Sequence, residues 1–404
     1  MIIPAALRAE AEATFARMGL PGRDNEAWKY TPTTALSQGG FQPPPAEPRP
    51  ATASRVSVKG LVADLAFVNG VCVARACGPA RSLLEALPVQ LGLIDAHLAR
   101  LADFRDPKLG ALLALNTAHF PDAAILDVPA QATPEPVYLH FHGCATEEPT
   151  VYAPRALIHV GEGAVVEIIE HHTGSGPCWN NAVTEVIVEA GAKVTFVRIQ
   201  EQDGDTFHTG ATYVRLARGA RFASFDFTCG AKLTRSEIHV ALEGEGSEAN
   251  LSGVYVLGGQ AHADHYTVIE HKAPHTTSTE LYKGVLDGRS RGVFTGCIRM
   301  NAGCSGATTR QKNPNLLLSN EAHIESRPQL EIKHNDVKAY HGATVGRLDE
   351  DALFYLRSRG LDEDGARRLL TTAFVGEVID AIGIEAVEGH LRTWLHGALG
   401  GSAA

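Results

Sequence analysis

The hydrophobic and polar positions between residues 135 and 340 repeat with a fixed period. Four segments share one pattern, in which an apolar, strand-like run leads to a glycine and a second such run follows. The glycines that mark the pattern lie 27 or 28 residues apart and are Gly163, Gly191, Gly219 and Gly246. A regular period of this length is typical of repeat architectures. Glycine also suits a turn that needs a positive φ.

Apolar residues recur in step after these glycines. Three residues further on, the chain has Val166, Val194, Phe222 and Ala249. Side chains at a constant offset stack on one another when successive coils lie about 4.8 Å apart. No segment of helical period separates the strands, so βαβ units are not expected. The pattern therefore predicts a parallel β-helix over 135–342 with two strands in each coil. An antiparallel sandwich with accidental spacing is the alternative.

Both ends of the chain carry different patterns. Residues 5–18 are mostly strong helix formers, and a second helical stretch is expected near 91–118. Five prolines within 42–53 predict a linker. The region 1–134 is therefore expected to be a mixed α/β unit that precedes the solenoid.

The region 343–404 is expected to be a C-terminal helical domain. Asp349 is a predicted N-cap for a helix over 351–359, with Gly360 at its C-terminal end. Asp362 is the predicted cap of the next helix, whose apolar residues follow helical spacing.

Composition narrows the possible functions. The formal net charge of -10 gives no electrostatic support for nucleic-acid binding. The seven cysteines include no CxxC pair, and the odd number does not fit a disulfide framework. No signal-like leader and no apolar run of about 18 residues is visible, so a cytoplasmic protein without a membrane span is expected. No Gly-x-x-x-x-Gly-Lys-Ser/Thr loop is present to hold ATP phosphates.

His341 is the most informative candidate for chemistry. It opens the run 341–346, where the β-rich region gives way to a predicted helix. This position predicts a single imidazole presented at a boundary, and imidazole can bind iron, zinc or copper. The alternative is a histidine whose nitrogens are satisfied by neighbouring carbonyl groups.

Other candidates have simpler explanations. The histidines at 262, 265, 271 and 275 are dense enough to suggest metal ligands. Residues an odd number apart on a strand point to opposite faces, which favours a structural or interface role. Cys297 and Cys304 lie among small residues and are expected to behave as small apolar side chains, as are the cysteines at 72 and 77.

A β-helix enzyme acting on polysaccharide is an alternative function. Sugar cleavage needs two carboxylates that face one cleft, and the candidates are Asp264 and Asp287. The solenoid pattern alone motivates this hypothesis, and a fold does not imply a function.

Short motifs over most of the chain resemble those of a known protein family. They are Leu20-Pro21, 25–31, Leu115-Asn116, His262, Asp264, His265, Thr267, His271, Pro274, Ser278, 282–284, 294–296, 316–319, 327–332, Asp336-Val337, 341–346 and 354–360. Together they resemble the SufB/SufD family of the Suf iron–sulfur cluster assembly system, and within it the D-type subunits.

The resemblance implies a mainly β protein, with a right-handed parallel β-helix core between an N-terminal α/β region and a C-terminal helical domain. It implies a non-enzymatic scaffold subunit that pairs with a SufB-like sibling and docks a SufC-like ABC ATPase, in which the ATPase activity is expected. For an isolated chain, a homodimer is an alternative assembly. The candidates for docking are Phe354, Tyr355, Arg357, Arg359 and Phe374.

The resemblance also makes His341 the candidate metal ligand for a nascent iron–sulfur cluster at the interface with the sibling. The cluster would be shared and transient, with none bound tightly by the isolated chain. The sibling carries a cysteine before its equivalent of Pro328, whereas 319–327 has none here. D-type subunits often have Cys-Ser where this chain has Ala339-Tyr340, so a sulfur ligand must come largely from the partner. A structural adaptor that never contacts iron is the third hypothesis.

Overall fold

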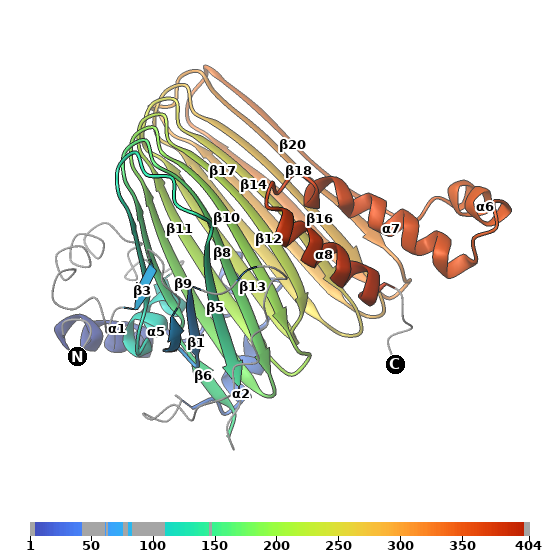
Figure 1. Cartoon of the computed structure of the whole chain (residues 1–404), viewed down its shortest axis with the longest axis horizontal. Helices are drawn as coiled ribbons and strands as arrows, with labels where there is room; N and C mark the ends of the chain where they lie inside the picture. Colours follow the sequence, from blue (N-terminus) through green and yellow to red (C-terminus); the bar gives the residue numbers. More distant parts are fainter. Residues whose placement is uncertain are drawn as a thin grey trace.

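The protein is a parallel β-solenoid with helices attached near both ends (Figure 1). The computed structural model describes residues 5–42, 61, 64–75, 80–82, 110–144 and 148–399. Strands make up 49% of the chain and wind through about 8 turns, which confirms the predicted parallel β-helix. Most of the proposed linker over 42–53, residues 91–109 of the helix proposed near 91–118, and Cys77 lie outside the described residues.

Two parallel sheets form the walls of the solenoid, and each coil contributes one strand to each sheet. The first sheet contains, in spatial order, β2 (Val71–Arg75), β1 (Leu65–Val68), β5 (Val137–Cys144), β8 (Val165–Ser175), β10 (Lys193–Gln202), β12 (Arg221–Gly230), β14 (Glu248–Leu257), β16 (Thr277–Leu286), β18 (Ala307–Leu317) and β20 (Val337–Gly346). The second contains β19 (His323–Ile332), β17 (Arg291–Met300), β15 (His262–His271), β13 (Leu233–Leu242), β11 (Phe207–Leu216), β9 (Cys178–Val188), β7 (Arg155–Val160), β4 (Ala124–Val128) and β3 (Ala80–Ser82). The short β6 (Thr150–Tyr152) pairs with β9.

The turn glycines set the spacing of the coils. Gly163, Gly191, Gly219 and Gly246 have φ angles of 67°, 68°, 64° and 67°. The backbone N–H of Gly191 donates to the carbonyl of Arg218 one coil further on, at 2.9 Å. The sequence-based prediction of a positive φ is therefore confirmed, because an L side chain is disfavoured in this conformation.

The apolar positions stack in register. Val194 of β10 lies opposite Val166 of β8 and Phe222 of β12, and Phe196 lies opposite Ile168. All of these side chains are buried in the largest apolar cluster, between the two sheets. Because side chains alternate across a strand, every second residue enters this core and its neighbours face outward.

The N-terminal region covers the outer face of the second sheet. It contains α1 (Ala5–Met18), the 3₁₀ turn η1 (Glu26–Trp28), α2 (Thr34–Gln38) and α5 (Gly110–His119). The first of these matches the helix predicted over 5–18. Ala11 of α1 and Leu113 of α5 pack together against Val183 of β9.

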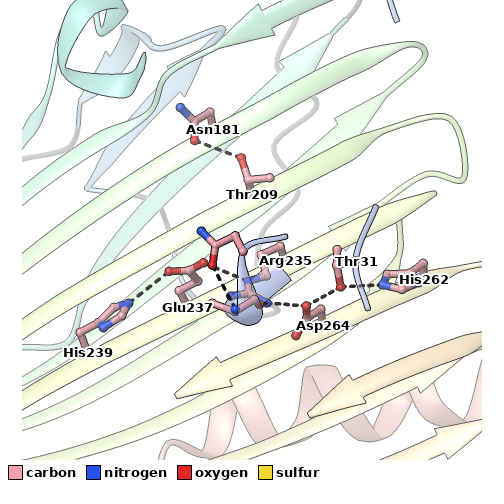
Figure 2. A network of polar contacts seen from close by, with 10 residues as sticks. Thr31, Asn181, Thr209, Arg235, Glu237, His239, His262 and Asp264 are labelled. Carbon is pink, nitrogen blue, oxygen red and sulfur yellow. Dashed lines mark hydrogen bonds and ion pairs between the residues drawn. The ribbon is translucent and has the colours of Figure 1, made fainter. Parts of the chain in front are cut away.

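A buried ion network fastens η1 to this sheet (Figure 2). The guanidinium of Arg235 on β13 pairs with Glu237 at 2.9 Å and with Asp264 of β15. It also donates to the carbonyl of Ala27 at 2.9 Å and lies 4.4 Å from the ring of Trp28. Burial raises the pKa of Glu237, but Arg235 and His239 together outweigh it and lower the pKa to about 2. The 25–31 motif therefore holds the N-terminal region on the solenoid.

Three helices follow the last strand: α6 (Glu350–Ser358), α7 (Glu363–Ile379) and α8 (Glu385–Ala398). Asp349 caps α6 by accepting from the N–H groups of Asp351 and Ala352, as predicted. Asp362 caps α7 in the same way. Figure 1 shows α7 and α8 along the first sheet, with α6 projecting away. Their packing uses buried side chains that include Val378, Leu391 and Leu395 on the helices, and Val197, Ile199 and Phe227 on the strands.

Replacing a turn glycine should cost stability through the backbone alone. A Cβ at Gly219 meets no atom within 4 Å, so Gly219→Ala tests only its φ of 64°. We expect the free energy of unfolding to fall by about 1 kcal/mol. Gly204→Ala is the control, because its Cβ also enters open space and its φ lies outside the left-handed region. Chemical denaturation should show the control unchanged or slightly more stable; equal losses would contradict the explanation.

Candidate functional site

The solenoid ends in two edge strands, each of which is paired on one side only. β19 is the last strand of the second sheet and β20 the last strand of the first, and no described strand lies beyond either. Their surface is partly apolar: the exposed fractions are 49% for Ile332, 61% for Tyr340 and 54% for Val345. An unpaired edge presents a row of free backbone N–H and C=O groups, which is a template for pairing with another chain. We refer to β19 and β20 together as the open end.

His341 lies in the middle of β20 and is exposed. Its register partner in β18 is Gln311, which is only 1% exposed because it points into the solenoid. His341 therefore occupies an inward-facing position in a coil that nothing covers. The predicted boundary between 342 and 343 falls inside β20, so the imidazole is carried by a strand and not by a loop.

A column of polar side chains leads from His341 into the solenoid. Glu280 of β16, Gln311 of β18 and His341 of β20 follow one another in register. The amide of Gln311 donates to one carboxylate oxygen of Glu280. The second oxygen of Glu280 and the amide oxygen of Gln311 are buried without a hydrogen-bond partner. Burial raises the pKa of Glu280 to about 7, because the charged carboxylate loses its hydration.

The other inward-facing residues of β18 are also polar. Asn313 donates to Tyr255 Oη at 3.1 Å, and Tyr255 Oη donates to Asn315. Ser326 of β19 donates to Asn313 Oδ1 at 2.7 Å, which joins the two walls. Buried amides of this kind must be hydrogen-bonded to be tolerated. The last coil is therefore polar inside, and earlier coils also bury polar groups between the two sheets, such as Arg198, which donates to Glu170 and Thr212.

The cysteines near this end are not available as thiolates. Cys297 is 2% exposed on the outer face of β17, and burial raises the pKa of its thiol to about 11. Cys304 is buried in a small apolar cluster with Ile298 and Met300, and burial raises its pKa also. Both therefore act as small apolar residues, as predicted. Cys72 is partly exposed, and the described cysteines form no disulfide with one another.

The four histidines near β15 do not meet at one point. His262 faces outward and lies 3.0 Å from Thr31 Oγ1, whereas His265 is buried inside the solenoid. His271 is also inside, bonded to the hydroxyls of Thr276 and Ser278. His275 sits in the following turn with a φ of 54°. The opposed faces of His262 and His265 match the odd-number argument. The ring of His265 is stacked on that of Tyr255, and its two nitrogens are buried without a hydrogen-bond partner.

The two carboxylates proposed for sugar cleavage are also separated. Asp264 is 1% exposed beneath the N-terminal region, where it accepts from Thr31 and Arg235. Asp287 is an exposed turn residue whose side chain accepts from the N–H of Gly288. They do not face a common cleft, so the polysaccharide hypothesis has no site in this pair.

The docking candidates fall into two groups. Phe354 and Tyr355 on α6 are 75% and 56% exposed, and Arg359 lies 5.1 Å from the ring of Tyr355. Arg357, also on α6, lies 3.8 Å from a carboxylate oxygen of Glu363. Phe374 belongs to α7 and is half-buried, with Lys283 donating to its carbonyl at 2.6 Å. Its ring therefore helps to hold α7 on the solenoid.

The polar column was missed from the sequence, although a signal was present. β18 places Thr309, Gln311, Asn313 and Asn315 at alternate positions. Earlier coils have apolar residues such as Val194 and Phe196 at the matching register. Extending the repeat alignment to the last coil would have identified Gln311, whereas its contact with Glu280 depends on side-chain conformation.

The solenoid ends in edge strands that another chain can extend. Comparison with known proteins identifies the family. Residues 142–374 match the family described as SUF system FeS cluster assembly, SufBD core domain. The chain belongs to the SufBD family of the SUF iron–sulfur cluster assembly system. None of its described helices is long and apolar enough to cross a membrane.

Relatives align over nearly the whole chain. An iron–sulfur cluster assembly SufBD family protein of Synechocystis is 29% identical over 404 residues, covering 92% of this chain and 86% of the relative. The iron–sulfur cluster assembly protein SufD of Escherichia coli is 28% identical over 371 residues, covering 91% and 86%. The chloroplastic protein ABCI7 of Arabidopsis thaliana is 26% identical over 411 residues, covering 97% and 86%.

The raised pKa of Glu280 predicts a pH-dependent stability. Its folded pKa of about 7 exceeds the value near 4.5 expected when unfolded, so the stabilising contribution is complete below about pH 4.5 and is lost as the pH rises through 7. Glu280→Gln removes this loss. We expect the variant to gain up to about 3 kcal/mol relative to the wild type between pH 5 and 8. Denaturant unfolding across this range measures the difference.

Glu321→Gln, which changes an exposed carboxylate, is the matched control. A pH-dependent gain of the same size in both variants would contradict burial of Glu280 as the cause.

Proposed function

We propose that this chain is a non-enzymatic scaffold subunit of a Suf iron–sulfur cluster assembly complex, of the D type. In this proposal the open end pairs with a SufB-like sibling and the C-terminal helices dock a SufC-like ABC ATPase. The observation that carries the proposal is the exposed His341 on the edge strand β20 of a chain that belongs to this family.

The form of the open end supports pairing with another solenoid. A parallel edge strand can be extended only by a strand of matching twist and spacing, which a sibling solenoid supplies. The exposed side chains of Ile332, Tyr340 and Val345 add apolar surface to the backbone hydrogen bonds. A second copy of this chain offers the same edge, so a homodimer is the expected state when the sibling is absent.

His341 is proposed as a ligand for the nascent cluster, which is the cargo of the complex. Iron in such clusters is held mainly by thiolates, and imidazole replaces a thiolate in some centres. The chain has no cysteine after Cys304, and Ala339-Tyr340 precedes His341. A sulfur ligand would then come largely from the partner, which supports a cluster held between the two subunits. The described cysteines form no disulfide, which fits a reducing compartment. The complex is therefore proposed to be cytoplasmic.

The helix α6 is the proposed contact for the ATPase. Two adjacent exposed aromatic residues, Phe354 and Tyr355, with Arg357 and Arg359 beside them, match the composition of energetically important interface residues.

The D assignment also agrees with the alignment to the Escherichia coli relative that carries the name SufD.

The ligand role predicts a loss of activity without a loss of assembly. His341→Ala should lower cluster maturation by more than about tenfold, because even side chains that only support a metal ligand contribute 10–100-fold. The complex should still co-purify, because the backbone edge and the apolar residues remain. Anaerobic reconstitution with the sibling and the ATPase, followed by iron and sulfide analysis, measures the yield.

His323→Ala is the matched control, since His323 is an exposed imidazole on the neighbouring strand that faces outward. Wild-type yield from His341→Ala would defeat the ligand role and leave the adaptor hypothesis. Loss of assembly in the same variant would assign His341 to the interface itself.

The docking role of α6 predicts a separate defect. Replacing both Phe354 and Tyr355 by alanine should weaken ATPase binding by about 2 kcal/mol, roughly thirtyfold, with little change in the unfolding midpoint. Leu369→Ala on α7 is the control, because Leu369 is another apolar side chain that is 49% exposed. Surface-bound titration of the ATPase gives both affinities, and an equal effect of the control would rule out a specific α6 contact.

A further inference from the structure

Three side chains from distant parts of the chain converge on the outer face of the first sheet. His171 of β8, Glu201 of β10 and His390 of α8 place their ligand atoms within 4.8 Å of one another. His171 Nε2 lies 2.9 Å from Glu201 Oε2. His390 Nε2 lies 2.9 Å and 3.0 Å from the two oxygens of the same carboxylate. The cluster is separate from the open end, because β10 is five strands away from β20 in the sheet.

The cluster is rigid on one side and accessible on the other. The His171 side chain is 0% exposed, whereas those of Glu201 and His390 are 12% and 18% exposed. An ion can therefore enter from solvent and meet a fixed imidazole beneath it.

A second contact orients the buried imidazole. Tyr138 Oη lies 2.8 Å from His171 Nδ1, and the tyrosine ring is stacked beside the imidazole. Metal-binding histidines usually have such a partner on the ring nitrogen that does not bind the ion. The tyrosine hydroxyl can donate or accept, so it serves both tautomers of His171 without any movement of the side chains.

We propose that His171, Glu201 and His390 form a binding site for a divalent first-row metal ion of the zinc class, which fastens α8 to the solenoid. Two imidazoles and one carboxylate are a donor set that suits such ions and leaves a fourth position for water. An imidazole binds an ion through a ring nitrogen that carries no proton, so Nε2 of both histidines must be unprotonated when the ion is bound. The proton of His171 is then on Nδ1, which lies 2.8 Å from Tyr138 Oη and can donate to it.

The site joins elements that the solenoid repeat does not connect. His171 and Glu201 belong to adjacent coils, and His390 lies on the helix that packs beside them through Leu391 and Leu395. A bound ion stabilises only the state in which α8 is docked, so it raises the stability of that contact by mass action. The inference concerns the attachment of the C-terminal helices and does not depend on cluster assembly.

The test is a Zn²⁺ titration of the isolated full chain after treatment with a chelator. We expect the wild type to bind one more equivalent of Zn²⁺ at high affinity than His390→Gln, as measured by calorimetry in a competing chelator. The glutamine keeps a hydrogen-bond donor toward Glu201 but is a poor zinc ligand. His396→Gln is the matched control, because His396 is exposed on the same helix and lies outside the cluster.

Thermal unfolding supplies the second readout. Zn²⁺ should raise the unfolding midpoint of the wild type and of His396→Gln but not of His390→Gln, and Mg²⁺ should change none of them. Tyr138→Phe should weaken zinc binding by about 10–100-fold while retaining the site. If His390→Gln does not fold, Glu201→Gln replaces it in both measurements. Equal zinc binding by the wild type and the site variants, or an equal loss in His396→Gln, would overturn the proposal.

Discussion

The structure depends on one constraint, which is that each strand pairs only with the strand one coil before it and one coil after it. Parallel pairing in exact register runs through both walls, for example along Phe196, Ser224 and Leu251. At the N-terminal end the antiparallel strands β2 and β3 close the two sheets. At the other end β19 and β20 have no such closure among the described residues. The same rule that builds the solenoid therefore leaves one edge ready for another chain.

The interior changes character along the solenoid axis. The inward column of the first sheet contains, in order, Ile168, Phe196, Ser224, Leu251, Glu280, Gln311 and His341. The apolar residues of this column contribute hydrophobic stabilisation, since they remove carbon surface from water. Its last residues are an amide, a carboxyl group and an imidazole, which need hydrogen-bond partners. The change concerns this column alone, because other inward positions of the earlier coils are also polar, as in the buried pair of Arg198 and Glu170.

The three C-terminal helices differ in how they contact the solenoid. α7 and α8 pack on the first sheet through a buried apolar cluster, and Lys283 and Glu201 add polar contacts to Phe374 and His390. α6 takes no part in that cluster and leaves Phe354 and Tyr355 exposed. Two helices are therefore attached firmly and the third leaves its aromatic residues exposed, while β20 carries the exposed His341 at the open end. The two candidate surfaces can engage different subunits.

The sequence alone determined the features that repeat or act locally. The glycine period predicted the coils, because a positive φ depends on the type of a single residue. Asp349 and Asp362 predicted where their helices begin, because a helix cap depends on a side chain and the next few residues of the chain. The motif of 341–346 pointed to His341. Only the tertiary structure decided that Gln311 lies beneath this imidazole, that Arg235 holds the 25–31 motif, and that His390 meets His171. These contacts join residues far apart in the chain, and a one-dimensional pattern carries no information on which outward side chains a packed helix will meet.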